Sequence, residues 1–248
     1  MIDIHSHILP GLDDGAATIE EAIAMASCAI ADGIKQMVVT PHVKSRTYPS
    51  KKAILDKMVN LQDVLQKNGI NLLLVPGAEY RIDPELPRQL ARGELLTIND
   101  KGRYLLVEFS DVSVPDYSTD VFSELLKQGV TPIIAHPERN SVFIEDHNRL
   151  YELLSNGALA QLTSGSLTGY FSPYITTAAR SFLERGYIHF IASDAHSRSG
   201  QLLQFKPAVW EAKRLLSEEE ARRLLISNPQ RALRGELIEA CELMKKVI

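Results

Sequence analysis

Two histidines stand one residue apart near the start of the chain, in the segment MIDIHSHILPGLDDG. His5 and His7 follow a short apolar run, and the adjacent acids Asp13 and Asp14 come soon after. Residues i and i+2 of a strand point to the same side, so both imidazoles could bind one metal ion. A hydrophilic turn uses the same residue types. The pair therefore needs partners elsewhere before it indicates a metal site.

Candidate partners end six of seven apolar runs. The runs span residues 2–7, 35–42, 70–80, 103–110, 130–138, 158–164 and 187–196. Each is almost continuously apolar, which is typical of strands buried on both faces of a parallel sheet. Helical patterns lie between them, at roughly 18–33, 50–68, 117–128, 146–156 and 172–185, and the chain after the seventh run is also helical.

Strand–helix alternation with short connections predicts parallel strands joined by right-handed crossovers. We expect one α/β domain over residues 1–248, built as a closed barrel of about seven strands with extra C-terminal helices. An open doubly wound sheet is the second alternative. In a barrel the C-terminal strand ends meet at one face, where barrel active sites lie.

The run ends carry imidazoles and carboxylates, namely His5, His7, His42, Glu79, Glu108, His136, Asp194 and His196. We add Asp14 as a ligand and interpret Asp13 as a structural partner. This mixed set suits manganese, iron, zinc or related divalent ions, and its size predicts two or three of them. Glu108 lies inside the apolar segment YLLVEF, where an unpaired carboxylate is costly, so a cation must lie nearby. His189 in YIHFIA precedes its run end, and we expect a core histidine.

Composition excludes several function classes. The chain has 248 residues, 45% hydrophobic and 23% charged, with a net charge of −4, which does not favour nucleic-acid binding. The sequence predicts no signal peptide and no membrane insertion. The two cysteines, Cys28 and Cys241, form no C-x5-R motif, which argues against a cysteine-nucleophile phosphatase, and they favour a reducing cytoplasm.

The segments DIHSHILPGLDDG, TPH, GAEY, VEF, AHPERN and SDAH together resemble the PHP (polymerase and histidinol phosphatase) superfamily. They are most similar to its bacterial protein-tyrosine phosphatases from capsule and exopolysaccharide gene clusters. The resemblance covers essentially the whole chain. It implies a distorted (β/α)7 TIM-like barrel with three metal ions, usually Mn²⁺, with iron, cobalt and zinc as alternatives.

The resemblance also implies a role for each matching residue. His5, His7, Glu79 and Asp194 would bind the first metal, Glu79, Glu108 and His136 the second, and Asp14, His42 and His196 the third. Arg139 would clamp the phosphate. The family's second phosphate-binding arginine follows SDxH by several residues, whereas Arg198 follows His196 by only two, so that role stays open. Arg46, in the loop HVKSRTYPSKK, either receives an acidic phosphopeptide or is simply solvated.

The chemistry of such a site is hydrolysis of a phosphate ester. Closely spaced cations lower the pKa of a bridging water, so hydroxide forms near neutral pH, and they neutralise charge in an in-line displacement. The planar guanidinium of Arg139 fits phosphate bidentately. Tyrosine is a fair leaving group because its pKa is about 10, and His42, His196 or a metal-bound water could assist the proton transfer.

We therefore predict a cytoplasmic, metal-dependent protein-tyrosine phosphatase. The resemblance suggests the tail of a bacterial tyrosine kinase, which regulates polysaccharide synthesis, as the substrate. A small-molecule phosphatase acting on histidinol phosphate is the first alternative, and a non-catalytic metal-stabilised scaffold for a kinase complex is the second. Tyr170 and Phe171, in TSGSLTGYF, either stack on a substrate ring or pack internally. The sequence leaves the oligomeric state open.

Overall fold

The computed structural model describes residues 1–43, 49–196 and 205–238, so Arg46 and Arg198 lie outside the described residues. Strands and helices alternate along these ranges, as the sequence predicts. The strands are β1 (Ile2–Ser6), β2 (Gln36–Val39), β3 (His42–Val43), β4 (Leu73–Pro76), β5 (Glu79–Arg81), β6 (Tyr104–Glu108), β7 (Thr131–Ala135), β8 (Leu159–Thr163) and β9 (Phe190–Ala192).

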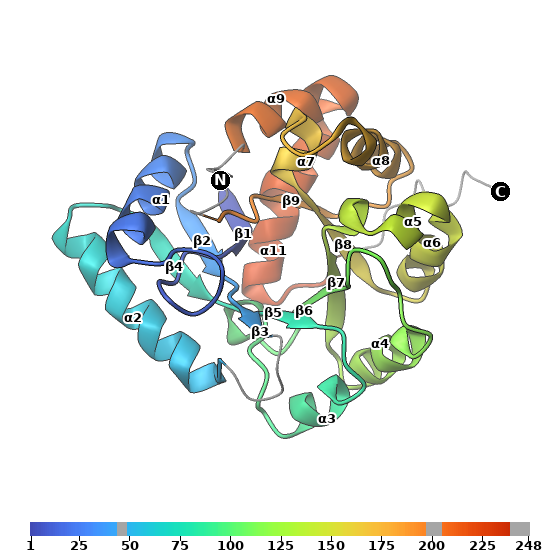
Figure 1. The fold of residues 1–248 in the computed structure, drawn as a ribbon, viewed down its shortest axis with the longest axis horizontal. Coiled ribbons are helices and arrows are strands. Elements are labelled where there is room, and N and C mark those ends of the chain that lie inside the picture. The colour runs from blue at the N-terminus through green and yellow to red at the C-terminus, as the bar shows by residue number, and fades with distance from the viewer. Residues whose placement is uncertain (44–48, 197–204, 239–248) are drawn as a thin grey trace.

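The paired strands are parallel and lie in two sheets, ordered β1-β2-β4 and β3-β5-β6-β7-β8-β9. The second apolar run supplies β2 and β3, and the third supplies β4 and β5. Each run therefore pairs with its neighbour along the chain. A parallel bridge between Ser6 and Ala195 joins the segment after β9 to the end of β1. The seven runs thus close into a distorted ring, around which the helices are arranged (Figure 1).

The expectation of one strand for each of the second and third runs is wrong. Each run is interrupted near a proline, which lacks the N–H that a sheet ladder requires. Pro41 directly precedes β3, and Pro76 ends β4. His42 and Glu79 consequently begin short second strands instead of ending long ones.

A β-bulge in β1 sets where its side chains point. Asp3 pairs with Met37 and Ser6 pairs with Val39, so β1 advances by three residues where β2 advances by two. Such an extra residue reverses the alternation of side chains along the strand. Ile4 packs in the apolar cluster inside the ring, and the adjacent His5 also lies inside, against the carboxylates of Glu79 and Asp194.

Helices surround the ring and close one of its ends (Figure 1). They are α1 (Ile19–Ala31), α2 (Lys51–Lys67), α3 (Leu86–Ala91), α4 (Ser118–Lys127), α5 (Ser141–Glu145), α6 (His147–Ser155), α7 (Ser164–Thr168), α8 (Pro173–Glu184), α9 (Phe205–Leu215), α10 (Glu218–Arg222) and α11 (Asn228–Arg234), with 3-10 turns η1 (Ile98–Asp100) and η2 (Pro137–Arg139) and the π-helical turn η3 (Arg223–Ser227). The predicted helices correspond to α1, α2, α4, α6 and α8, whereas α3, α5 and α7 are additional. No helix within the described ranges is long and apolar enough to cross a membrane.

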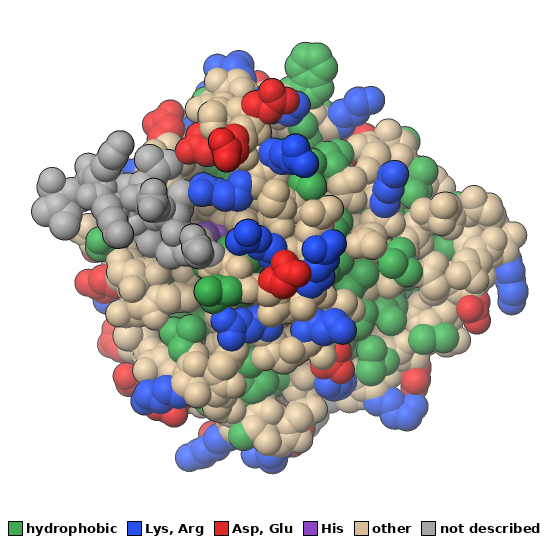
Figure 2. Space-filling model, turned by 180° about the vertical axis from the view of Figure 1, so that it is seen from behind, with side chains coloured by type: hydrophobic (Ala, Val, Ile, Leu, Met, Phe, Trp, Pro, Cys, Tyr) green, Lys and Arg blue, Asp and Glu red, His purple; other side chains and the backbone are tan. Residues whose placement is uncertain are grey.

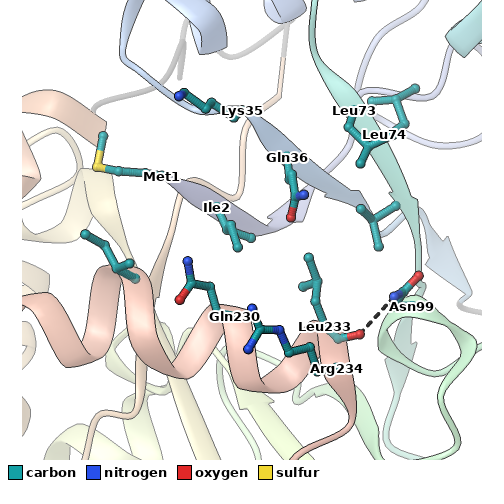
Figure 3. A pocket seen from close by; sticks show the side chains of 12 residues that line it. Met1, Ile2, Lys35, Gln36, Leu73, Leu74, Asn99, Gln230, Leu233 and Arg234 are labelled. Carbon is teal, nitrogen blue, oxygen red and sulfur yellow. Dashed lines mark hydrogen bonds between the residues drawn. The ribbon is translucent and has the colours of Figure 1, made fainter.

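One end of the ring, which we call its base, is closed by α11. Ala232 and Leu233 of α11 join the apolar cluster inside the ring. A cavity of about 590 Å³ remains between α11 and the starts of β1 and β2, with Gln36 and Arg234 on its wall (Figure 3). On the face opposite to that of Figure 1, lysine and arginine side chains gather around the middle (Figure 2).

Candidate metal centre

The nine predicted metal ligands converge at the ring end opposite the base, the mouth. Six of them line a polar cavity of about 310 Å³: Asp14, His42, Glu108, His136, Asp194 and His196. The other three, His5, His7 and Glu79, are fully buried. Within residues 1–43, 49–196 and 205–238, each group of three or more potential ligand atoms belongs to this centre.

The innermost group has the spacing of ligands around one ion. Nε2 of His5 lies 3.1 Å from Nε2 of His7. Glu79 Oε2 lies 3.3 and 3.4 Å from these two nitrogens, and Asp194 Oδ1 lies 3.3 Å from each. Four ligands in a tetrahedron at about 2.1 Å from an ion are about 3.4 Å apart. The atoms of His5, His7 and Asp194 therefore fit a single metal ion, and Glu79 Oε2 lies beside the two imidazoles.

Glu79 connects this group to its neighbours through both carboxylate oxygens. Its Oε1 lies 3.0 Å from Nε2 of His136, and its Oε2 lies 2.8 Å from Nδ1 of His42. The same Nδ1 lies 3.1 Å from Oε1 of Glu108. Glu79 thus belongs to two triads whose potential ligand atoms lie close enough together to hold an ion. One triad is His42, Glu79 and Glu108, and the other is His5, Glu79 and His136. Glu79 is placed to bridge ions, although the triads differ from the Glu79, Glu108 and His136 set that the resemblance implies.

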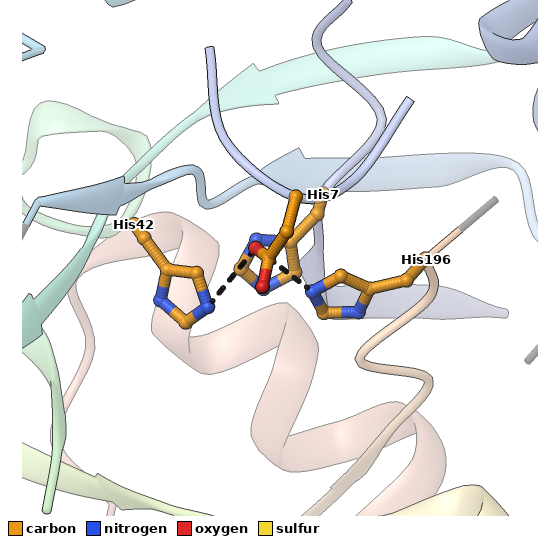
Figure 4. A group of neighbouring side chains, drawn as sticks. His7, His42 and His196 are labelled. Atoms are coloured by element: carbon orange, nitrogen blue, oxygen red, sulfur yellow. Dashed lines mark ion pairs between the residues drawn. The ribbon is translucent and has the colours of Figure 1, made fainter. Parts of the chain in front are cut away.

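An outer group surrounds Asp14. Its Oδ1 lies 3.5 Å from Nε2 of His42 and 3.6 Å from Nε2 of His196. The His196 ring stacks on that of His7 with centroids 4.0 Å apart, and Figure 4 shows the three rings around one carboxylate. His42 therefore faces the inner ligands with Nδ1 and the outer group with Nε2.

The acidic loop after β1 holds these imidazoles. Asp13 Oδ2 lies 2.7 Å from Nδ1 of His7 and accepts a hydrogen bond from the backbone N–H of His42. A Cβ at Gly15 would lie 2.0 Å from the carbonyl oxygen of His7, so only glycine permits this close approach. Carboxylates that bind the second nitrogen of a metal-ligating histidine fix its tautomer and orientation. Asp13 thus has the structural position that the sequence suggests.

Other supporting residues were not identified from the sequence. Gln161 Oε1 lies 2.7 Å from Nδ1 of His5, so it orients that ring. Its signal was a single polar residue inside the apolar segment ALAQLT. Ser193 donates from its backbone N and its Oγ to the carboxylate of buried Asp3, and these bonds tie β1 to the end of β9. The two strands that carry His5 and Asp194 are thereby held in register.

Two of the predicted ligands occupy strained backbone positions. His136 has φ of +33° and Asp194 has φ of +50°, both left-handed conformations in non-glycine residues. Such conformations cost on the order of 1–3 kcal/mol each and gather at functional sites. Each residue lies just beyond a strand end, where the turn directs its side chain into the centre. Strand alternation alone would not give these directions.

The electrostatics of the centre favour positive charge. Burial alone would lower the pKa of His42, but the carboxylates of Glu108 and Glu79 raise it to about 9. Burial alone would raise the pKa of Glu79, yet His5 and the other imidazoles hold it well below its usual range. Cations bound among these groups would satisfy the same negative charge.

Three buried atoms of the predicted ligands also have no hydrogen-bond partner among the described residues: His42 Nδ1, Glu79 Oε2 and Glu108 Oε1. The 2.8 Å approach of His42 Nδ1 to Glu79 Oε2 is not aligned as a hydrogen bond, although the distance alone would allow one. Two atoms that bind the same metal ion lie this close to each other without a hydrogen bond between them. Because unsatisfied buried polar atoms are rare and costly, the residues present fit bound metal ions.

Arginines stand beside the centre. Nη1 of Arg139 lies 2.6 Å from Oδ2 of Asp194, and its guanidinium lies 5.2 Å from the ring centroid of Phe171. Phe171 thus packs against Arg139, with Tyr170 edge-on to it at 5.2 Å. Arg81, which the sequence analysis overlooked, also lines the cavity. Its signal was its place two residues after Glu79.

The chain matches the family model described as "Capsular polysaccharide synthesis, CpsB/CapC" over residues 1–234. Tyrosine-protein phosphatase YwqE of Bacillus subtilis (strain 168) is 37% identical over 239 residues, which cover 96% of this chain and 93% of that relative. Tyrosine-protein phosphatase CpsB of Streptococcus pneumoniae is 29% identical over 245 residues, covering 96% of this chain and 100% of the relative.

Solved structures agree with these relatives. One from work on YwqE and CpsB, described as "unique metal-dependent tyrosine phosphatases", has a TM-score of 0.93 at 37% identity and covers 97% of each chain. Organophosphorus hydrolase from Deinococcus radiodurans has a TM-score of 0.62 at 14% identity, covering 94% of this chain and 92% of that one. The second likeness shows the fold alone.

Proposed function

We propose that this chain, which belongs to the CpsB/CapC family of capsular polysaccharide synthesis, is a metal-dependent protein-tyrosine phosphatase. Relatives of nearly full length carry that activity in their names, and one solved relative is described as metal-dependent. The observation that carries the proposal is the set of overlapping ligand groups sharing Glu79, next to Arg139 in one polar cavity.

We assign three divalent cations to the ligand groups. The first would be held by His5, His7 and Asp194, whose atoms lie within reach of one another, together with Glu79, whose Oε2 lies 3.3 and 3.4 Å from the two imidazoles. The second would share Glu79 and use Glu108 and His136, and the third would use Asp14, His42 and His196. Manganese is the proposed metal because the resemblance implies it, and the mixed imidazole and carboxylate set is also suited to iron, cobalt or zinc.

The protein's own groups position the phosphate and the leaving group. When bound, the cations would lower the pKa of a coordinated water and neutralise phosphate charge. Arg139 presents two parallel N–H donors to phosphate oxygens, and Asp194 and Phe171 hold its guanidinium at the cavity wall. His42 and His196 line the cavity with 11% and 14% of their side chains exposed, and we propose that they assist departure of the tyrosyl oxygen as ligands of the third cation. Because the pKa of tyrosine is about 10, this assistance is a small part of the rate.

A cysteine nucleophile plays no part in the proposed reaction. Cys28 lies in α1 and does not line the cavity, and Cys241 falls outside the described residues. The substrate is a tyrosine-phosphorylated protein. More finely, we propose the tail of a bacterial tyrosine kinase that regulates capsular or exopolysaccharide synthesis, encountered in the cytoplasm.

Hydrolysis rates on three substrates test the proposal. Protein stripped of metal by a chelator and reloaded with Mn²⁺ should hydrolyse a phosphotyrosine peptide and should be much slower on phosphoserine peptide and on histidinol phosphate. Metal analysis of the reloaded protein should give three ions per chain. Faster turnover of histidinol phosphate would favour the small-molecule phosphatase. Bound metal without turnover under any divalent ion would leave only the scaffold role.

The Arg139→Ala variant tests the phosphate clamp. We expect unchanged metal content and a kcat/KM lower by about a hundredfold, the effect of losing a charge-assisted, bidentate contact. Arg88→Ala is the matched control, because Arg88 lies on α3, is 75% exposed and pairs only with Glu85 among its ion pairs in the described ranges. Equal activity of the two variants would contradict the clamp role.

A further inference from the structure

A second arginine shares the cavity with Arg139. The two cationic side chains on the wall of the 310 Å³ cavity, within the described residues, are Arg81 and Arg139. Arg81 ends β5 and Arg139 ends η2 after β7, so the two flank β6, which lies between those strands. A group that fills this small cavity would therefore meet guanidinium groups from two walls.

The strand directs Arg81 toward the centre. It follows Glu79 by two residues in the same short strand, and residues at that spacing point to the same side. Glu79 is the ligand common to the inner groups. The backbone that places the bridging carboxylate therefore also places Arg81 at the cavity wall, with its side chain 36% exposed.

The contact of Arg81 with protein leaves its donors largely unused. Its Nη2 lies 3.4 Å from Oε1 of Glu108, whereas Arg139 approaches Asp194 to 2.6 Å. The Glu108 oxygen is also 3.1 Å from Nδ1 of His42 and is assigned above as a metal ligand. With a cation on Glu108, the carboxylate no longer needs Arg81 for neutralisation, and the guanidinium can face an anion in the cavity.

We propose that Arg81 is a phosphate-binding residue that contacts the substrate phosphate together with Arg139. The inference rests on the proposed function, since that phosphate is the group the cavity would hold. Phosphate is favoured over a peptide carboxylate because Arg81 lines the same small cavity as the ligand groups, where the ester must react.

Inorganic phosphate is the probe that separates the parts of this proposal. Its dissociation constant is measured by calorimetry on Mn²⁺-loaded wild type, Arg81→Ala, Arg81→Lys and the exposed control Arg88→Ala, with metal content determined for each. We expect Arg81→Ala to weaken phosphate binding about tenfold, with metal content unchanged. Arg81→Lys should recover only part of this, because lysine lacks the planar fork. Arg88→Ala should match wild type.

Phosphotyrosine kinetics supply the second readout, in which Arg81→Ala should raise KM about tenfold. Loss of metal from Arg81→Ala with unaltered phosphate affinity after reloading would overturn the proposal and leave Arg81 as the counter-ion of Glu108. A higher peptide KM with unaltered phosphate affinity would also overturn it, in favour of contact with the peptide. Failure of the wild type to hydrolyse phosphotyrosine would sink the proposed function, while the phosphate affinities would still decide the role of Arg81.

Discussion

Two fully buried histidines at opposite ends of the ring show opposite electrostatics. At the base, burial and the nearby Arg223 lower the pKa of His189 to about 4. Its Nδ1 accepts a hydrogen bond from the backbone N–H of Ala160 at 3.2 Å. At the mouth, burial alone would lower the pKa of His7 too, but the hydrogen bond with Asp13 and the nearby carboxylates of Asp194 and Glu79 raise it well above its usual range.

Burial therefore does not decide what a histidine does in this fold. The His189 ring accepts from a backbone N–H and lies near the cationic Arg223, so the ring stays neutral. The neighbours of His7 are carboxylates, which together need positive charge. The base uses an imidazole as a packing and hydrogen-bonding group, whereas the mouth uses imidazoles as part of a charged set that bound cations would complete.

The largest expected effect comes from removing one negative charge at the mouth. Glu79→Gln keeps the shape of the side chain but removes the bridging carboxylate, so metal content should fall and kcat/KM should drop by about a thousandfold. Metal analysis and phosphotyrosine hydrolysis measure this. Glu138→Gln is the matched control, because Glu138 is also buried but accepts from Thr163 and Ser166 and belongs to none of the ligand groups. Full metal content in Glu79→Gln would contradict a bridging role.

The next effect concerns the base. His189 has a lowered pKa in the folded chain, so the unfolded chain binds more protons between pH 6.5 and about 4, and stability falls as the pH falls through that range. The shift corresponds to roughly 3 kcal/mol. His189→Asn does not titrate there, so its free energy of unfolding should decline less than that of wild type between pH 7 and 4. An equal decline in the free energy of unfolding for wild type and His189→Asn would show that the pKa of His189 is not lowered in the folded chain.

A smaller effect is expected for the residue that orients His7. Asp13→Ala should weaken metal affinity by about ten- to a hundredfold, since partners of ligating histidines have effects of this size. Competition with a chelator measures the affinity. Asp13→Asn retains an oxygen acceptor for the backbone N–H groups, so its affinity should fall between wild type and alanine. Equal affinity in all three proteins would show that His7 is held without Asp13.

The smallest effect tests the aromatic contact at the mouth. Phe171→Leu preserves apolar volume but removes the ring face over which Arg139 lies, an interaction worth about 0.5–1 kcal/mol at a partly exposed site. We expect kcat/KM to fall about threefold with metal content unchanged. A fall close to that of Arg139→Ala would mean instead that Phe171 contacts the substrate.

The ring of parallel strands followed from the sequence because continuous apolar runs separated by helical patterns leave few other arrangements. The details of the strands did not. Pro41 and Pro76 split two runs, and their effect depended on which strands had to pair. Asn228, a good N-cap residue by type, instead lies within a continuous helical stretch and is buried against His189, because the π-helical turn η3 carries α10 into α11.

For the metal centre, the sequence by itself determined which residue types stood at the strand ends, since ligand chemistry depends on the side chain alone. Only the tertiary structure decided which atoms meet. Three backbone features set the directions of these side chains and the distances between their ligand atoms. They are the bulge in β1, the left-handed turns at His136 and Asp194, and the approach of Gly15 to His7. These features arise from contacts between residues far apart in the chain, so no local pattern reveals them. The positions of Arg81 and Gln161 beside the predicted ligands likewise depend on how their strands pair.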